Sequence, residues 1–221
     1  MDAQVVPVVV AHLGRVDQAD NLMKQLPENA RCFMDSGFLG EWKNHRRALE
    51  WGWAQDVSHV VVLQDDAVLV DGFMDHVQEA ASRRPEDLIG LYVGTGRPHA
   101  AAVLGAVDVA RRSRASWIVT DGLIWGVGIV FPVKMINPFL TWCARTHSRL
   151  PYDQRITAWC RETRTRVSHT WPSLVDHADV PSVIKGRARH LETVRVAHEW
   201  GVPNWNDVEV NMLLHGSTLR P

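Results

Sequence analysis

The sequence predicts an α/β protein in which helices flank a mostly parallel central sheet. Residues 59–69, His-Val-Val-Val-Leu-Gln-Asp-Asp-Ala-Val-Leu, begin as a nearly continuous aliphatic run, typical of a strand that is buried on both faces. Helical patterns stand on either side of this run, which is the order that a parallel sheet requires. With 221 residues, 46% hydrophobic and 22% charged, the chain has the composition and length of one globular domain.

The remaining elements follow from periodicity and from turn residues. In the first half we expect strands at residues 4–11, 30–34 and 88–93, and helices at residues 17–26, 41–56 and 72–84. Residues 99–116 look less regular and end in an exposed basic loop. Beyond them we expect apolar pieces at 117–120 and 124–131, a helix at 132–146 interrupted at Asn137-Pro138, a helix at 152–161, a strand at 167–171 and a loop at 172–177. The tail from residue 187 has no assignable element.

Charge and cysteine content narrow the class of protein. The net charge of −1 does not indicate that the chain as a whole binds nucleic acid or a membrane. Cys32, Cys143 and Cys160 show no paired spacing, which predicts free thiols in a reducing, cytoplasmic compartment. We expect no signal peptide and no membrane span, because the apolar run near the start contains a proline and lacks a preceding basic segment.

The central strand ends in two adjacent carboxylates, Asp65 and Asp66, which we call the acidic pair. A buried carboxylate costs several kcal/mol unless a cation neutralises it. The carboxyl end of a central strand is where α/β sheets bind ligands, so a divalent metal is the natural partner there. The alternative is that both residues only cap the following turn.

The first strand and the turn after it resemble the start of a nucleotide-binding βα unit, since His12-Leu13-Gly14-Arg15 precedes a helix. We expect His12 and Arg15 at the nucleotide, with Arg15 on a phosphate; a surface arginine is the alternative. Asp35 ends the second strand and could accept hydrogen bonds from a base or ribose. Its alternative role is that of a turn aspartate before Gly37.

Two stretches resemble a known family. Leu63-Gln64-Asp65-Asp66-Ala67, preceded by Asn44-His45-Arg46-Arg47-Ala48-Leu49, resembles the metal-binding segment of GT-A glycosyltransferases, closest to glycosyltransferase family 25 (the lipopolysaccharide/collagen galactosyltransferase type) and related phage enzymes. Pro172-Ser173-Leu174-Val175-Asp176-His177 is similar to the C-terminal metal-site loop of the same group. The family commonly has Glu where this chain has Gln64, which cannot add charge to the metal site.

The resemblance implies a single GT-A domain over residues 1–221. Its nucleotide-sugar-binding half would be residues 1–98, its acceptor and metal-loop half 99–190, and its tail 191–221. It also implies a nucleotide-sugar donor, UDP-sugar above all, bound through Mn²⁺ or Mg²⁺, because a divalent ion neutralises the departing diphosphate.

The resemblance further implies a role for individual residues. Asp66 and His177 would be the metal ligands, and Asp65 would orient the sugar or a metal-bound water. The remaining donor-binding candidates are His12, Arg15, Asp35, Arg46, Gln64, Lys185 and Arg187, with Arg189 as a further residue over the diphosphate. For the three basic residues of the tail, the alternative is a solvated surface.

An inverting transfer needs a base that takes the proton of the acceptor hydroxyl. Asp153 is the first candidate, because it opens a helix between the glycine-containing segment 126–128 and the His177 loop; an N-cap is the alternative. Asp121, beside Gly122, is the second candidate.

The acceptor is predicted from charge. Basic residues exceed acidic ones between residues 145 and 189, and Arg111, Arg112 and Arg114 add to the excess. This would suit a DNA acceptor, and the phage resemblance indicates a hydroxylated or hydroxymethylated pyrimidine. A protein or glycan hydroxyl is the alternative. A metal-dependent nuclease and a non-catalytic nucleotide- or DNA-binding module are the rival classes.

Overall fold

The computed structural model describes residues 3–96, 100–146, 149–178 and 195–214. Its larger sheet contains β1 (Val5–His12), β2 (Arg31–Asp35), β3 (His59–Gln64), β5 (Leu88–Gly90), β6 (Trp117–Thr120), β7 (Gly128–Pro132), β8 (Val167–Thr170) and β10 (Glu209–Met212). Its smaller sheet pairs β4 (Ala67–Leu69) with β9 (Val175–His177). The helices are a 3₁₀ turn (Leu13–Arg15), α1 (Val16–Met23), α2 (Glu41–Trp53), α3 (Phe73–Arg83), α4 (Ala100–Ser113), α5 (Val133–Thr146) and α6 (Tyr152–Thr163).

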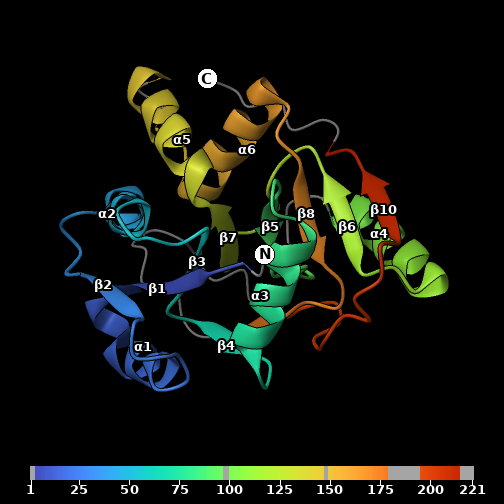
Figure 1. Cartoon of the computed structure of the whole chain (residues 1–221), viewed down its shortest axis with the longest axis horizontal. Coiled ribbons are helices and arrows are strands. Elements are labelled where there is room, and N and C mark those ends of the chain that lie inside the picture. The colour runs from blue at the N-terminus through green and yellow to red at the C-terminus, as the bar shows by residue number, and fades with distance from the viewer. Residues whose placement is uncertain (1–2, 97–99, 147–148, 179–194, 215–221) are drawn as a thin grey trace.

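The larger sheet is mixed and runs in the order β10-β6-β8-β5-β7-β3-β1-β2 (Figure 1). Among the described residues, four of its seven neighbouring strand pairs are parallel. The antiparallel β7 lies between β3 and β5, so strands from the two halves of the chain interleave in one sheet. The predicted α/β class with a mostly parallel sheet is therefore confirmed, and the predicted halves share a single sheet.

Helices cover both faces of the sheet, because successive strand residues point to opposite sides. Val60 and Val62 of β3 belong to a buried cluster with residues of α2, α5 and α6. Val61 and Leu63 of the same strand belong to a second cluster with residues of α1 and α3. At the far end of the sheet, α4 packs against β6 and β10. This layering explains why the β3 run is apolar throughout.

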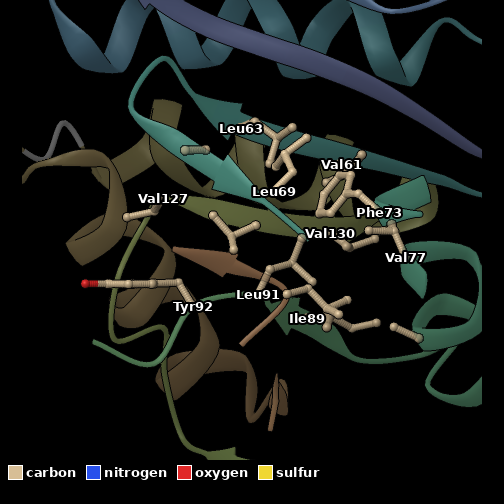
Figure 2. Close-up of a cluster of buried hydrophobic side chains, with 14 of the residues drawn as sticks. Val61, Leu63, Leu69, Phe73, Val77, Ile89, Leu91, Tyr92, Val127 and Val130 are labelled. Carbon is tan, nitrogen blue, oxygen red and sulfur yellow. The ribbon is translucent and has the colours of Figure 1, made fainter. Parts of the chain in front are cut away.

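Figure 2 shows the second of these clusters, where Val61, Leu63 and Leu69 gather beside Phe73 of α3. Tyr92 lies at its margin, and its hydroxyl points away from the other labelled side chains. Tyr92 follows β5, so its polar end reaches the carboxyl edge of that strand.

Several expectations for individual elements are wrong. Residues 100–113 form α4 instead of an irregular segment, because Val103, Ala106, Val107 and Ala110 place an apolar stripe on one side of a helix. Pro138 does not interrupt α5, which is continuous from Val133 to Thr146.

The central strand ends at the acidic pair as expected, but the residues after the pair form a further strand that was not predicted. The predicted strand is β3, and the unpredicted one is β4, which belongs to the smaller sheet. The stretch predicted as a loop contains β9, the partner of β4. In the tail that had no assignable element, β10 pairs with β6. These strands of three or four residues exist because a distant partner completes their hydrogen bonds, which no local pattern reveals.

Gly128 allows β9 to lie against the large sheet. A Cβ at Gly128 would be 3.1 Å from Val175 Cγ2 and 3.3 Å from Leu91 Cβ. The backbone of Leu91 bonds to both neighbours, accepting from the Val175 amide at 3.1 Å and donating to the Gly128 carbonyl at 2.9 Å. Val175 of β9 and Leu91 therefore approach this glycine closely. The three cysteines are free thiols, as expected.

Candidate functional site

Three neighbouring parallel strands end at one edge of the sheet and bring the predicted residues together. The strand β1 lies between β2 and β3, with His12 level with Asp35 and Val10 level with Gln64. The acidic pair follows Gln64 directly. The expected location of Asp65 and Asp66, at the carboxyl end of an interior strand, is therefore confirmed.

Arg15 bridges the acidic pair. Its Nη1 donates to Asp65 Oδ1 at 2.8 Å and also to Asp66 Oδ2, and the backbone N–H of His12 donates to Asp65 Oδ2 at 2.9 Å. All three side chains of this cluster are buried, with residue exposures of 9% for Arg15, 7% for Asp65 and 5% for Asp66. The arginine predicted for a phosphate is thus the counter-ion of the acidic pair in this structure.

Burial and charge act in opposite directions on these groups. Burial raises the pKa of Asp65 above its ordinary value, although the His12 amide and the Arg15 guanidinium pull it down. Burial by itself lowers the pKa of Arg15, but the charges of Asp66 and Asp65 outweigh it and the pKa lies above its ordinary value. Arg15 therefore stays cationic and compensates one of the two negative charges.

His177 lies beside the acidic pair, although it is far from the pair in the sequence. Pairing of β4 with β9 sets Ala67 opposite His177, and the Ala178 amide donates to the Asp66 carbonyl at 2.9 Å. His177 Nε2 lies 3.4 Å from Asp66 Oδ2. Asp66 Oδ1 is buried and has no hydrogen-bond partner among the described residues, and the same holds for His177 Nδ1.

A set of side chains around His177 was not predicted from the sequence. Asp176 Oδ1 accepts hydrogen bonds from the His177 amide at 2.8 Å and from the Ala197 amide at 2.6 Å. The Tyr92 ring lies 6.3 Å from the His177 ring and 5.6 Å from the Trp125 ring, between centroids. Burial raises the pKa of Tyr92, and the charge of nearby Asp176 raises it further. The position of Tyr92 just after β5 was the one signal that could have identified it.

Asp35 holds the turn that follows β2. Its Oδ1 accepts from the amides of Gly37 and Leu39, at 2.9 and 3.1 Å, and its Oδ2 accepts from the Gly40 amide at 2.9 Å. Burial by itself raises the pKa of Asp35, but the hydrogen bonds from these three amides lower it by more. The pKa of Asp35 therefore lies below its ordinary value. Gly37 has a φ of +92°, a backbone conformation that residues with a side chain rarely adopt. The turn role proposed as the alternative for Asp35 therefore accounts for both of its oxygens.

The other predicted donor-binding residues are distributed differently. His12 Nδ1 accepts from the Gly14 amide at 2.9 Å, which keeps the ring at the same edge of the sheet. Gln64 is partly exposed at the end of β3, and its backbone N–H donates to the Val127 carbonyl at 2.9 Å. Arg46 lies on the exposed face of α2, where it pairs with Glu50 at 2.7 Å. Lys185, Arg187 and Arg189 lie outside the described residues.

The two candidates for the catalytic base lie at opposite edges of the sheet. Asp153 is the second residue of α6, beside Gly126, where a Cβ would be 3.6 Å from Asp153 Cβ. Gly126 lies two residues before β7, whose first residue pairs with Leu63 near the end of β3. Asp153 therefore lies at the same edge of the sheet as the acidic pair. Pro151 is the N-cap of α6, so Asp153 is not the N-cap residue, but its Oδ1 accepts from the backbone N–H of Gln154 in the first turn at 2.8 Å.

The strands β5 and β8 run in the same direction as β3, because β5 and β3 are both antiparallel to β7 and β8 is parallel to β5. Asp121 follows β6, which is antiparallel to β8 and therefore ends at the edge opposite to the acidic pair. Its carboxylate accepts from Arg161 Nε at 3.1 Å and from the Leu214 amide at 3.0 Å. The structure does not bring Asp121 together with the acidic pair.

The fit of a divalent cation can be judged from the donors present. No group of three or more His, Cys, Asp or Glu side chains within the described ranges is arranged to hold a metal ion. Asp66 nevertheless offers a buried carboxylate oxygen without a partner, and the His177 imidazole lies beside the same carboxylate. A carboxylate suits Mn²⁺ or Mg²⁺, and an imidazole fits Mn²⁺ better than Mg²⁺, when a diphosphate supplies further oxygens. The residues therefore fit a metal that the donor and the protein would hold together.

Comparisons with known proteins add little. None of the protein families compared with the chain matches it, and neither does any curated protein. Among solved structures the chain is similar to one described as "Crystal Structure of A197 from STIV", with a TM-score of 0.42 and 10% sequence identity over 79% of this chain and 85% of that one. A likeness of this extent carries no argument about function. Over the described part of the chain, no helix has the length and apolar character needed to span a membrane.

Proposed function

We propose that this chain is a glycosyltransferase that uses Mn²⁺ or Mg²⁺ to transfer a sugar from a nucleotide-sugar, UDP-sugar above all, to a hydroxyl acceptor. The observation that supports it is the meeting of Asp66 and His177 at the carboxyl edge of β3, with one Asp66 oxygen left without a partner among the described residues. The two motifs that resemble GT-A glycosyltransferases thus lie together in space.

The chain's own residues divide the work. Asp66 and His177 would hold the cation, and Asp65, fixed by the His12 amide, would orient the donor. When bound, the cation would neutralise the charge that develops on the diphosphate as it leaves. The ring of Tyr92 and the indole of Trp125 would border the sugar beside His177.

Asp153 would serve as the base. As the acceptor oxygen forms its bond to the anomeric carbon and the bond to the diphosphate breaks, the hydroxyl proton would pass to the Asp153 carboxylate. The attack comes from the face opposite the leaving group, so the product would have the inverted configuration.

The DNA acceptor has less structural support than the transfer itself. Several arginines of the basic excess are engaged within the fold: Arg111 with Glu199, Arg161 with Asp121, Arg166 with Glu209, and Arg155 over the Trp42 ring. A hydroxylated or hydroxymethylated pyrimidine in DNA therefore stays a prediction, alongside a protein or glycan hydroxyl.

The test is release of free nucleoside diphosphate. UDP-sugars are incubated with the protein in Mn²⁺ or in EDTA, with and without DNA that contains hydroxymethylpyrimidine, unmodified DNA, and peptide or glycan acceptors. Metal-dependent release that Asp66→Ala abolishes would support the proposal. Cleavage of the DNA without any UDP release would instead identify a nuclease, and binding without turnover would identify a non-catalytic module.

A further inference from the structure

Arg15 occupies the place where a cation would meet the acidic pair. We propose that Arg15 is the resident counter-ion of Asp65 and Asp66, and that a divalent cation has to displace it, so that guanidinium and metal compete for the same carboxylates. This inference rests on the metal dependence in the proposed function and goes beyond it, because it makes metal binding an exchange of cations.

The competition follows from which atoms are shared. A single nitrogen, Arg15 Nη1, contacts one oxygen of each carboxylate and so lies between them. The oxygen that it contacts on Asp66, Oδ2, is also the one that lies 3.4 Å from His177 Nε2. A cation held by Asp66 Oδ2 and His177 would therefore contend with Arg15 for that oxygen, and a cation held by the partnerless Oδ1 would still lie on the carboxylate that Arg15 contacts.

Charge makes the two occupants incompatible. With Arg15 in place, the buried cluster of two carboxylates and one guanidinium has a net charge of −1. Adding a divalent ion without moving Arg15 would leave two like charges within a few ångströms in a poorly solvated site, which is strongly unfavourable. Without any cation, the two carboxylates would repel each other at the same place.

The displaced guanidinium would stay useful. Arg15 is the residue immediately before α1, at the carboxyl edge of β1, so its backbone remains beside the donor when its side chain moves. The incoming metal and diphosphate would thus exchange partners with Arg15: the carboxylates pass to the metal, and the guanidinium passes to a phosphate.

The test measures metal binding and stability separately from activity. Arg15→Gln keeps an N–H donor on a shorter side chain and removes the charge. We expect its melting temperature in EDTA to be lower than that of the wild type. Its Kd for Mn²⁺ alone, measured by calorimetry, should be lower by about tenfold or more, the equivalent of one pKa unit of charge coupling. Arg15→Lys should bind Mn²⁺ much as the wild type does. Arg83→Gln, which removes an exposed pairing with Glu79, is the matched control and should change neither quantity.

A second measurement uses the wild type and does not depend on whether Arg15→Gln folds. Side-chain ¹⁵N NMR should show the Arg15 Nε–H signal shifting as Mg²⁺ is added. The signal of Arg155, whose Nε donates to the Leu150 carbonyl at 2.7 Å, should not move. An unchanged Arg15 signal at saturating Mg²⁺ would overturn the exchange.

The outcomes separate this inference from the proposed function. If the wild type binds Mn²⁺ and releases UDP, but Arg15→Gln binds the ion equally or more weakly, the exchange is wrong and the function stands. If Arg15→Gln binds Mn²⁺ more tightly and no nucleotide-sugar is turned over, the exchange stands and the function is wrong. If neither protein binds Mn²⁺ or Mg²⁺, with or without added UDP, both are wrong.

Discussion

His177 Nε2 lies 3.4 Å from Asp66 Oδ2, and this contact depends on the pairing of two three-residue strands, β4 and β9. Asp66 directly precedes β4, and His177 is the last residue of β9. The backbone therefore sets their separation more than side-chain flexibility does. Substitutions at the two positions should consequently affect metal binding together.

Asp66→Ala should remove metal-dependent donor binding and turnover while the protein remains folded, because the carboxylate oxygens are what the cation would bind. The remaining Arg15–Asp65 pair is charge-balanced, so the melting temperature in EDTA should not collapse. Calorimetry with Mn²⁺, followed by a UDP-release assay, checks this. Full turnover of Asp66→Ala with Mn²⁺ would remove Asp66 from the site.

His177→Ala should weaken Mn²⁺ affinity by about 10–100-fold or more, since loss of a ligand costs at least as much as loss of an outer-shell partner. His76→Ala is a suitable control, because His76 stacks on Trp205 instead of contacting the acidic pair. Equal Mn²⁺ affinities for wild type and His177→Ala would show that the imidazole is not a ligand.

Asp153→Asn should lower kcat by about 10²–10⁴-fold with little change in donor affinity, the range for loss of a general base. Asp121→Asn should leave kcat near the wild-type value and reduce stability by about 1 kcal/mol, because it weakens bonds to Arg161 and Leu214 at the other edge of the sheet. Steady-state kinetics and urea unfolding of both variants distinguish the roles. A product that retains the donor's anomeric configuration would also exclude Asp153 as the base of a single inverting displacement.

Gly128→Ala should destabilise the fold by about 1–3 kcal/mol, the usual cost of overpacking, and should also weaken Mn²⁺ binding. The new methyl group would press on Val175 of β9, whose neighbour two residues on is His177. Val175→Ala removes the crowded Cγ2, so the double variant should recover part of both losses in a double-mutant cycle. Strict additivity of the two substitutions would argue against this contact.

The protein should lose stability in mild acid because of two buried histidines. Burial lowers the pKa of His45 to about 4 and that of His169 to about 4. The folded pKa is below the unfolded value of about 6.5, so their contribution is complete above pH 6.5 and is lost as the pH falls towards 4. Each shift corresponds to at most about 3 kcal/mol. Urea midpoints measured between pH 4 and 7 should show this slope, and a flatter slope in His169→Gln would confirm its source.

Some of the site was predictable because its signals are local. The aliphatic run of β3 and the carboxylates that end it are adjacent in the chain, and a strand that is apolar throughout must be buried on both faces. The turn role of Asp35 was also foreseeable, since a carboxylate two residues before a glycine often bonds the amides of its own turn.

Other features had weak local signals. Half of the stripe residues of α4 are alanines, so the stripe contrasts little with its surroundings. Tyr92 and Asp176 gain their significance only from neighbours that arrive from other strands.

The sequence by itself determined the α/β class, the buried strand β3 and the acidic pair at its carboxyl end, because each depends on residues close together in the chain. Only the tertiary structure decided which partners that pair has. Arg15 comes from the turn after β1, His177 from the strand β9, and Asp121 is carried to the opposite edge by the direction of β6. Strand order and direction arise from contacts between distant segments, and those contacts determine which charges share one buried site.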